Sequence, residues 1–143
     1  MKKNNTVLSV KKDFSIRFNE VDSMSFVWHG SYSSYFEDAR EAFGEKYGLG
    51  YLVIFNSGFY APLVELTFKY RKPMTYGMHP RIEITYIPSD AAKIIFDYAI
   101  YDNADDSLVA TGHSVQVFLD KQYQLVWYNP DFYAEWKKRW GIL

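Results

Sequence analysis

The chain has 143 residues, of which 48% are hydrophobic and 20% aromatic. This is enough apolar material for one domain with a buried core, which argues against intrinsic disorder. The 16 Lys and Arg are matched by 17 Asp and Glu, so the basic excess typical of nucleic-acid-binding proteins is missing and we expect no nucleic-acid partner. Because the chain has no cysteine, disulfides, thiol nucleophiles and thiolate metal sites are excluded.

The N-terminal segment begins with Met1-Lys2-Lys3, as a signal peptide can, but charged residues at 11–13 interrupt any apolar run. No stretch approaches the roughly 20 apolar residues that span a bilayer. We therefore expect a cytoplasmic protein with no membrane segment. Residues 1–12 are polar, and we expect them to be loosely held.

A strand and a long helix are the first predicted elements. Residues 14–18 alternate between apolar and polar side chains, which predicts a strand with one buried face. With Ser31 or a neighbour as N-cap and Gly48 as a stop signal, a helix is expected over about 31–46. Its apolar residues recur at spacings of three and four, as on one helix face: Tyr32, Tyr35, Phe36, Ala39, Phe43 and Tyr47.

The remaining patterns predict four strands, at 64–70, 82–86, 93–101 and 108–119. Short, turn-rich spacers between them favour antiparallel hairpins. Asn129-Pro130-Asp131 reads as a cap, a first-turn proline and a favourable acid that open a short helix over 131–140, whose Lys137-Lys138-Arg139 run is expected to face solvent. One long helix and several antiparallel strands can bury their apolar faces only on each other. We therefore predict an α+β fold in a single domain, residues 1–143, with its core at about 12–128.

The loop before the long helix carries the most chemical information. Asp22 lies in it, and Trp28, His29 and Gly30 close it at the mouth of the helix. Backbone N–H groups at a helix N-terminus stabilise negative charge, such as the charge that gathers on a thioester oxygen under attack. The order of residues thus brings a carboxylate and such N–H groups into one stretch of chain.

This segment resembles the 4-hydroxybenzoyl-CoA thioesterase family of hotdog-fold proteins, through Asp22, Val27-Trp28-His29, Tyr32, Tyr35, Glu37 and Arg40. The strand over 62–70, the Lys72-Pro73 step and the strand over 110–118 match as well, so the resemblance covers roughly residues 12–128. It implies a hotdog fold, an antiparallel sheet wrapped around one central helix, and hydrolysis of an acyl-CoA or acyl-carrier-protein thioester. It implies no cofactor beyond the CoA of the substrate, and a homodimer or homotetramer whose active site lies between two subunits.

The resemblance also implies roles for individual residues. Asp22 would be the nucleophile or the general base, two routes that the sequence leaves open, and the N–H of His29 would be an oxyanion donor. Ser25 stands where many members have Gly, so the loop is expected to differ in shape there. Between residues 89 and 93, where some members carry several basic residues for the CoA phosphates, only Lys93 is basic. Substrate-binding residues would be Trp28, Gly30, Tyr32, Lys69, Arg71 and Lys93.

Several alternatives remain open. Some hotdog thioesterases carry the acid on the helix, which makes Glu37 and Glu41 rivals of Asp22, although Glu37 and Arg40 also have the spacing of an intrahelical ion pair. The side chain of His29 has a structural alternative as a hydrogen-bond partner. Three scattered histidines give no metal-ligand spacing, so no metal site is expected. The competing functions are a hydratase or dehydratase, which the order Asp22 before His29 fits less well, and a non-catalytic acyl-binding protein.

Overall fold

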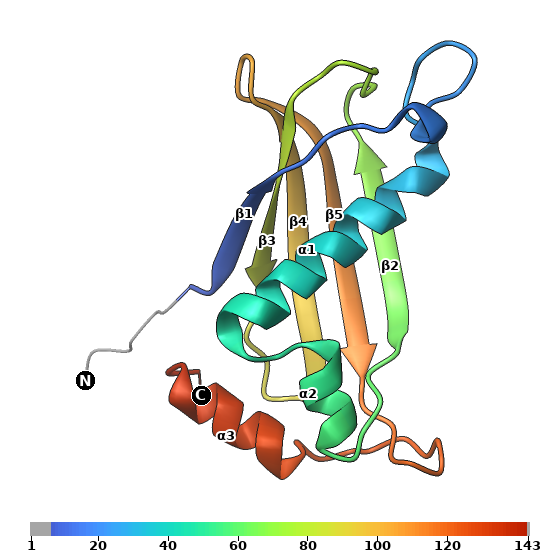
Figure 1. Cartoon of the computed structure of the whole chain (residues 1–143). Coiled ribbons are helices and arrows are strands. Elements are labelled where there is room, and N and C mark those ends of the chain that lie inside the picture. Colours follow the sequence, from blue (N-terminus) through green and yellow to red (C-terminus); the bar gives the residue numbers. More distant parts are fainter. Residues whose placement is uncertain (1–6, 143) are drawn as a thin grey trace.

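The computed structural model describes residues 7–142, which form one antiparallel sheet with a long helix across one face (Figure 1). The strand order is β1-β3-β4-β5-β2, so β1 and β2 are the two edges. The α+β prediction of a sheet around one long helix is confirmed. The elements are β1 (Ser9–Asp13), α1 (Tyr32–Tyr47), α2 (Tyr51–Asn56), β2 (Leu63–Tyr70), β3 (Pro80–Tyr86), β4 (Lys93–Asp102), β5 (Ser107–Val117) and α3 (Asp131–Arg139).

The first strand is shifted from its predicted position. Strand β1 covers residues that were expected to be loosely held and pairs with β3, with Asp13 opposite Arg81. Pro80 begins β3 and its carbonyl accepts one more bond, from the Phe14 N–H at 3.1 Å, after which the chain has no ladder partner. Of the apolar residues that alternate over 14–18, Ile16 is buried, Phe14 is half-buried and Phe18 is exposed, and the strand prediction there is wrong.

Helix α1 ends where the sequence indicates but begins differently. Gly48 has φ +73° and its N–H donates to the Gly44 carbonyl at 2.9 Å, a left-handed C-terminal stop. At the other end Ser31 occupies the N-cap position, as predicted, but it has helical dihedral angles and makes no side-chain capping bond. A 3-10 turn over His29–Ser31 leads into α1 instead.

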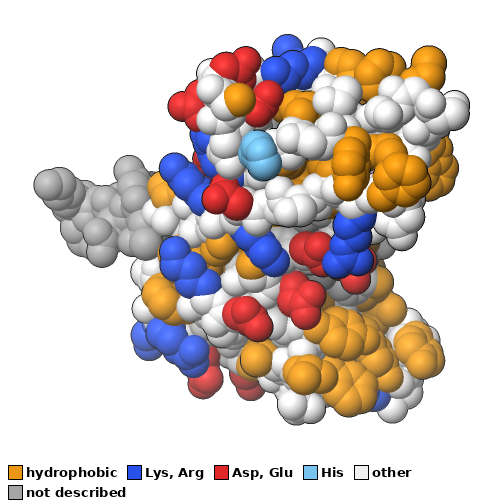
Figure 2. Space-filling view, turned by 45° about the horizontal axis from the view of Figure 1, so that its top comes forward, with side chains coloured by type: hydrophobic (Ala, Val, Ile, Leu, Met, Phe, Trp, Pro, Cys, Tyr) orange, Lys and Arg blue, Asp and Glu red, His pale blue; other side chains and the backbone are white. Residues whose placement is uncertain are grey.

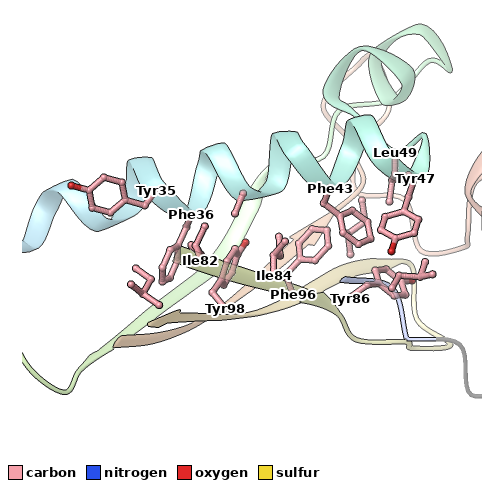
Figure 3. Close-up of a cluster of buried hydrophobic side chains, with 14 of the residues drawn as sticks. Tyr35, Phe36, Phe43, Tyr47, Leu49, Ile82, Ile84, Tyr86, Phe96 and Tyr98 are labelled. Carbon is pink, nitrogen blue, oxygen red and sulfur yellow. The ribbon is translucent and has the colours of Figure 1, made fainter. Parts of the chain in front are cut away.

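Aromatic side chains fill the space between α1 and the sheet (Figure 3). Phe36 is fully buried and stacks on Tyr98, with ring centroids 4.2 Å apart, and Phe43 lies edge-on to Phe96 at 4.8 Å. Each such side chain contributes about 1.5–3 kcal/mol by leaving water. Gly112 on β5 makes room for this layer, because a Cβ there would lie 1.9 Å from the Phe36 ring. The core thus fixes α1 at a set height above the sheet.

Two helices at the end of the sheet near the start of β2 differ from expectation (Figure 1). Helix α2 was not predicted, because six residues are too few for a periodic pattern. Pro130, and not Asn129 as predicted, occupies the N-cap position of helix α3, and the Asn129 side chain donates to the Asp90 carbonyl. Lys137 is buried and donates to the Ser89 carbonyl at 2.7 Å, so the prediction that it faces solvent is wrong. Burial lowers the pKa of Lys137 from its usual value.

Helix α3 also closes the far end of α1. The indole N–H groups of Trp136 and Trp140 both donate to the Tyr47 carbonyl, at 2.7 and 3.0 Å. Tyr47 belongs to the last turn of α1, whose carbonyls have no partner within the helix. Two side chains from the C-terminal segment therefore satisfy an acceptor in the first half of the chain.

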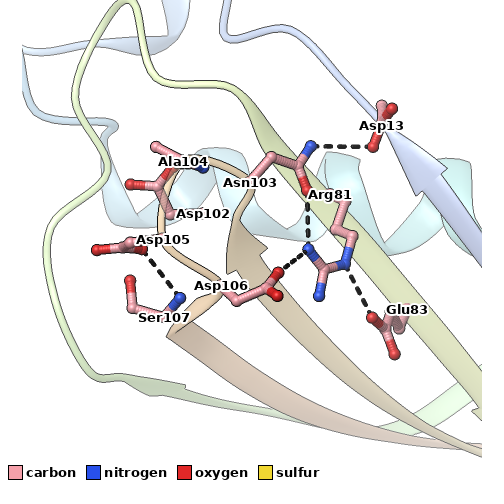
Figure 4. A network of polar contacts seen from close by, with 9 residues as sticks. All are labelled: Asp13, Arg81, Glu83, Asp102, Asn103, Ala104, Asp105, Asp106 and Ser107. Carbon is pink, nitrogen blue, oxygen red and sulfur yellow. Dashed lines mark hydrogen bonds and ion pairs between the residues drawn. The ribbon is translucent and has the colours of Figure 1, made fainter.

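A polar network holds the opposite end of the sheet together (Figure 4). The Arg81 guanidinium donates to Glu83 at 2.9 Å, Asn103 at 2.8 Å and Asp106 at 2.6 Å. Asn103 in turn donates to Asp13 at 3.0 Å. The bonds to Asp106 and Glu83 raise the pKa of Arg81 further above its usual value. Strands β1, β3 and the β4–β5 turn are thereby joined at one corner.

Candidate active site

A cavity of about 380 Å³ lies where the loop before α1, the start of α1 and the end of β2 meet. The predicted site residues Asp22, Trp28, His29, Tyr32 and Arg71 all contribute to its walls. The cavity therefore brings together a carboxylate, a helix start, aromatic side chains and a cation. Further lining residues are Phe26, Val27, Tyr70, Lys72 and Pro73.

The Asp22 carboxylate closes its own loop. The side-chain Oδ1 accepts hydrogen bonds from the N–H groups of Met24 at 2.8 Å and Phe26 at 3.2 Å. The backbone N–H of Asp22 donates to the Phe26 carbonyl at 2.7 Å. Both side-chain bonds use Oδ1, and Oδ2 has no hydrogen-bond partner within residues 7–142. One oxygen thus holds the loop while the other stays available to a ligand in the cavity.

The tightest point of this loop is Ser25, which has φ +65°. Most residues other than Gly adopt this left-handed conformation only at a cost of about 1–2 kcal/mol. The serine adopts a conformation that Gly reaches without strain.

Backbone bonds attach the loop to its surroundings. The Val27 N–H donates to the Met74 carbonyl at 2.8 Å, and the Trp28 N–H donates to the Glu20 carbonyl at 2.8 Å. The Glu20 side chain accepts the Tyr35 hydroxyl of α1 at 2.9 Å. Burial first, and this bond second, raise the pKa of Tyr35 far above its usual value. Glu20 thereby fixes the loop to the helix with both its main chain and its side chain.

The turn over His29–Ser31 leaves two N–H groups without partners. The Ser31 N–H donates to the Trp28 carbonyl, whereas the N–H groups of His29 and Gly30 have no hydrogen-bond acceptor in the described part of the chain. The Gly30 position has no room for a side chain, because a Cβ would lie 2.2 Å from the Trp28 ring. Two adjacent free donors at the start of a helix can stabilise a developing oxyanion.

The other side of the turn is held by Tyr70 at the end of β2. Its hydroxyl donates to the His29 carbonyl at 3.2 Å, and its ring lies edge-on to Tyr32 at 4.8 Å. Burial raises the pKa of both tyrosines. Sequence reasoning missed Tyr70 as a site residue, although its alternation with Phe68 already assigned it to the helix side of β2.

The two cations in the wall differ in how far they are neutralised. Lys72 donates to the Ser107 hydroxyl and lies 3.8 Å from Asp102 and 3.9 Å from Asp105. Hydrogen bonds from Ser107 first, with a smaller contribution from Lys72, lower the pKa of Asp105. Arg71 forms no ion pair among residues 7–142. Of the two cations in this wall, Arg71 is therefore the one that no described carboxylate neutralises.

Two predicted binding residues lie elsewhere. Lys69 contributes to a second cavity, of about 300 Å³, with Thr67, Asp97 and His113. These residues alternate along their strands with those under α1, so this cavity opens on the opposite face of the sheet. Lys93 begins β4 opposite Val117, near α3 and far from the end of β2. The chain by itself therefore does not bring Lys69 or Lys93 to Asp22.

The rival acids on α1 do not contribute to either cavity. Glu37 and Glu41 are exposed. The predicted ion pair between Glu37 and Arg40 is absent from the described residues, because the Arg40 guanidinium reaches across to the Tyr98 hydroxyl at 3.0 Å. Within residues 7–142 no three His, Cys, Asp or Glu side chains gather as metal ligands, and no helix is long and apolar enough to cross a membrane.

Known proteins resemble this chain over most of its length. It is 27% identical over 133 residues, 90% of this chain and 95% of the relative, to YneP of Bacillus subtilis (strain 168), which carries a provisional name as an acyl-CoA thioesterase. It is 25% identical to the chloroplastic acyl-acyl carrier protein thioesterase ATL3 of Arabidopsis thaliana, over 80% of this chain and 60% of that protein.

A solved structure agrees with the fold. The DHNA-CoA thioesterase of Staphylococcus aureus superposes with a TM-score of 0.80 at 21% identity, covering 92% of this chain and 90% of that one. The hotdog fold predicted from the sequence is thus confirmed. The model of the thioesterase-like superfamily matches residues 16–136, and the chain belongs to this superfamily.

Proposed function

We propose that the protein hydrolyses an acyl thioester of CoA or of an acyl carrier protein to a free acid and a thiol. One observation carries the proposal: Asp22 and His29 line the same cavity, and in the described residues neither the Asp22 Oδ2 nor the His29 N–H, nor the neighbouring Gly30 N–H, has a hydrogen-bond partner. A carboxylate that attacks or activates water, beside donors for the resulting oxyanion, is the minimum set for acyl transfer. The superfamily and the names of the relatives support the same chemistry.

In the nucleophilic route, Asp22 forms a bond to the thioester carbonyl carbon and the C–S bond breaks, which releases a thiolate. Water then cleaves the resulting anhydride, so that the acid leaves and Asp22 is restored. In the general-base route, Asp22 takes a proton from water as the water attacks, and the proton passes to the thiolate. The N–H groups of His29 and Gly30 hold the carbonyl oxygen in both routes.

The aromatic walls would hold the acyl chain and Arg71 a phosphate of the carrier. Trp28, Tyr32 and Tyr70 offer apolar surface beside Asp22, while Arg71 lies at the same cavity and has no counter-ion among residues 7–142. Lys69 and Lys93 could join a carrier site only through a second subunit, since they lie away from this cavity. We propose that a cytoplasmic homodimer or homotetramer is the active form.

The direct test is thiol release from a panel of acyl-CoAs and acyl carrier proteins, each with a thiol-reactive dye. Wild-type protein should release thiol from at least one acyl group. Failure with every acyl group would overturn the proposal and leave a non-catalytic acyl-binding protein, and hydration of an enoyl-CoA without thiol release would favour the hydratase.

Arg71→Gln tests the phosphate role separately. The variant should raise KM several-fold for acyl-CoA and leave KM unchanged for the matching acyl-pantetheine, which lacks the nucleotide phosphates. Lys138→Gln, on the exposed side of α3, is the matched control for loss of one positive charge. Equal effects on both substrates would show that Arg71 does not bind the nucleotide.

A further inference from the structure

The peptide between His29 and Gly30 carries one of the free donors at the start of α1. Its N–H belongs to Gly30 and its carbonyl belongs to His29. Because a peptide unit is planar, the direction of the carbonyl fixes the direction of the N–H. Whatever holds the His29 carbonyl therefore also aims the Gly30 N–H.

This peptide lies at the centre of a turn that can take two forms. The Ser31 N–H donates to the Trp28 carbonyl at 2.9 Å, and the residues between them are helical, as in a type I turn. In a type II turn the same bond closes the same four residues, but the central peptide is reversed and the third residue has a positive φ. Gly30 is that third residue, and glycine adopts a positive φ without strain.

The reversed form would remove a donor from the site. In the observed turn Gly30 has a negative φ, and its N–H points out of the helix start in the same direction as the His29 N–H. Reversal would exchange the Gly30 N–H for the His29 carbonyl, whose oxygen repels a developing oxyanion. The site therefore needs a contact that favours the observed form of the turn.

Two donors hold the His29 carbonyl in its observed direction. The Tyr32 N–H bonds to it within the turn, and the Tyr70 hydroxyl donates to it at 3.2 Å from the end of β2. Only Tyr70 comes from outside the local segment, 41 positions away in the chain. Reversal of the peptide would break both bonds. Bonds to a carbonyl also polarise its peptide, which strengthens the Gly30 N–H as a donor.

Packing fixes the position of the Tyr70 side chain. Its ring lies edge-on to Tyr32 at 4.8 Å and is stacked with Phe68 at 6.1 Å. Further apolar side chains gather on the surface at this end of the molecule (Figure 2). They include Phe18, Trp28 and Tyr76. Burial raises the pKa of Tyr70, so its hydroxyl keeps the proton that it donates at neutral pH. The bond to His29 thus comes from a held side chain in largely apolar surroundings.

We propose that Tyr70 is a positioning residue for thioester hydrolysis, whose hydroxyl keeps the His29–Gly30 peptide in the form that aims both free N–H groups at the substrate oxygen. The inference rests on the proposed function and deepens it. Tyr70 acts through the peptide, and no bond is made or broken at its hydroxyl. Tyr70→Phe isolates this role, because it removes the hydroxyl and keeps the ring that packs on Tyr32.

The first test is kinetic. Removal of a whole oxyanion donor costs about 10²–10³ in kcat, and the Tyr32 N–H still holds the carbonyl, so Tyr70→Phe should lower kcat by about ten-fold. KM should stay within about two-fold, because the donors act mainly on the transition state. Tyr128→Phe, which removes a hydroxyl from an exposed ring, is the matched control and should keep wild-type kcat. Wild-type kcat in Tyr70→Phe, with or without a lower melting temperature, would overturn the inference.

The second test reads the peptide without substrate. His29-Gly30 is the only His-Gly pair in the sequence, so protein labelled with ¹³C at histidine carbonyls and ¹⁵N at glycine gives one carbonyl–amide correlation in an NMR spectrum. Its signal should shift in Tyr70→Phe and stay in place in Tyr128→Phe. An unmoved signal in Tyr70→Phe would overturn the inference even in an active enzyme. If the wild-type protein releases no thiol from any acyl group, the proposed function fails, and this signal still decides whether Tyr70 holds the peptide.

Discussion

Asp22→Asn separates the chemical role of this residue from its structural role. The Oδ1 of asparagine can still accept the N–H groups of Met24 and Phe26, so the loop keeps both bonds. What disappears is the negative charge and the nucleophilic second oxygen. Since charged acceptors bind only somewhat more strongly than neutral ones, we expect the free energy of unfolding to fall by about 1 kcal/mol or less.

The effect on catalysis should be much larger. A positioned general base contributes about 10²–10⁴ in rate, which corresponds to roughly 3–5 kcal/mol of activation free energy. We therefore expect kcat to drop by at least about 100-fold with KM little changed. Asp22→Ala should lose a similar amount of activity and also lower the melting temperature, because both loop bonds lose their acceptor.

Thiol release under saturating substrate and a thermal melt of each variant are the two measurements. Glu37→Gln, an exposed acid of α1, is the matched control and should retain wild-type kcat. The reasoning is refuted if Asp22→Asn keeps its melting temperature and more than half of its kcat. A full loss in Glu37→Gln would instead move the chemistry to the helix.

Three further predictions concern the fold around the site. Gly112→Ala should destabilise the protein by about 1–3 kcal/mol in a urea titration, because the new Cβ displaces the Phe36 ring; an unchanged midpoint would contradict the packing described. Ser25→Gly should raise the free energy of unfolding by up to about 1 kcal/mol without loss of activity, since φ +65° costs glycine nothing, and a destabilised variant would argue against the loop conformation. Burial raises the pKa of Tyr133 and of Tyr86, so both stay protonated in the folded state while the unfolded chain ionises near its usual tyrosine pKa. The contribution of these two tyrosines to the free energy of unfolding is complete below that pH and is lost above it, at about 1.4 kcal/mol per pH unit for each group. Urea midpoints measured between pH 8 and 11 should therefore fall with pH, and a pH-independent midpoint would disprove the prediction.

The spacing of apolar residues in the sequence predicts the long helices and strands of this fold that bury only one face. The stripe on α1 and the alternation of the last four strands are visible because each element buries one face, and their observed positions agree within one or two residues. The first strand was misplaced because Phe14 and Ile16 pack against the core without belonging to a ladder, while β1 pairs through its backbone and has mostly exposed side chains. Burial and backbone pairing are separate properties, and the sequence pattern reports only the first.

For the site, spacing along one short segment was enough to group Asp22 with the residues that close the loop. The same reasoning could not find Tyr70, which reaches His29 from 41 positions away in the chain. Nor could it foresee that Lys72 is occupied by the acids of the β4–β5 turn, since that pairing depends on sheet geometry. Site residues that are close in the chain can be predicted from the sequence, whereas those that the sheet brings in from distant positions require the three-dimensional structure.

The bonds from Trp136 and Trp140 to the Tyr47 carbonyl have a consequence for biosynthesis. Trp136 follows Tyr47 by 89 positions in the chain. At a synthesis rate of about 5–20 residues per second, the ribosome adds Trp136 roughly 4–18 s after Tyr47. Throughout that interval the end of α1 and the adjoining aromatic layer have no cover from the same chain. Completion of the core is therefore tied to synthesis of helix α3, so the fold should close only after Trp136 and Trp140 have been added.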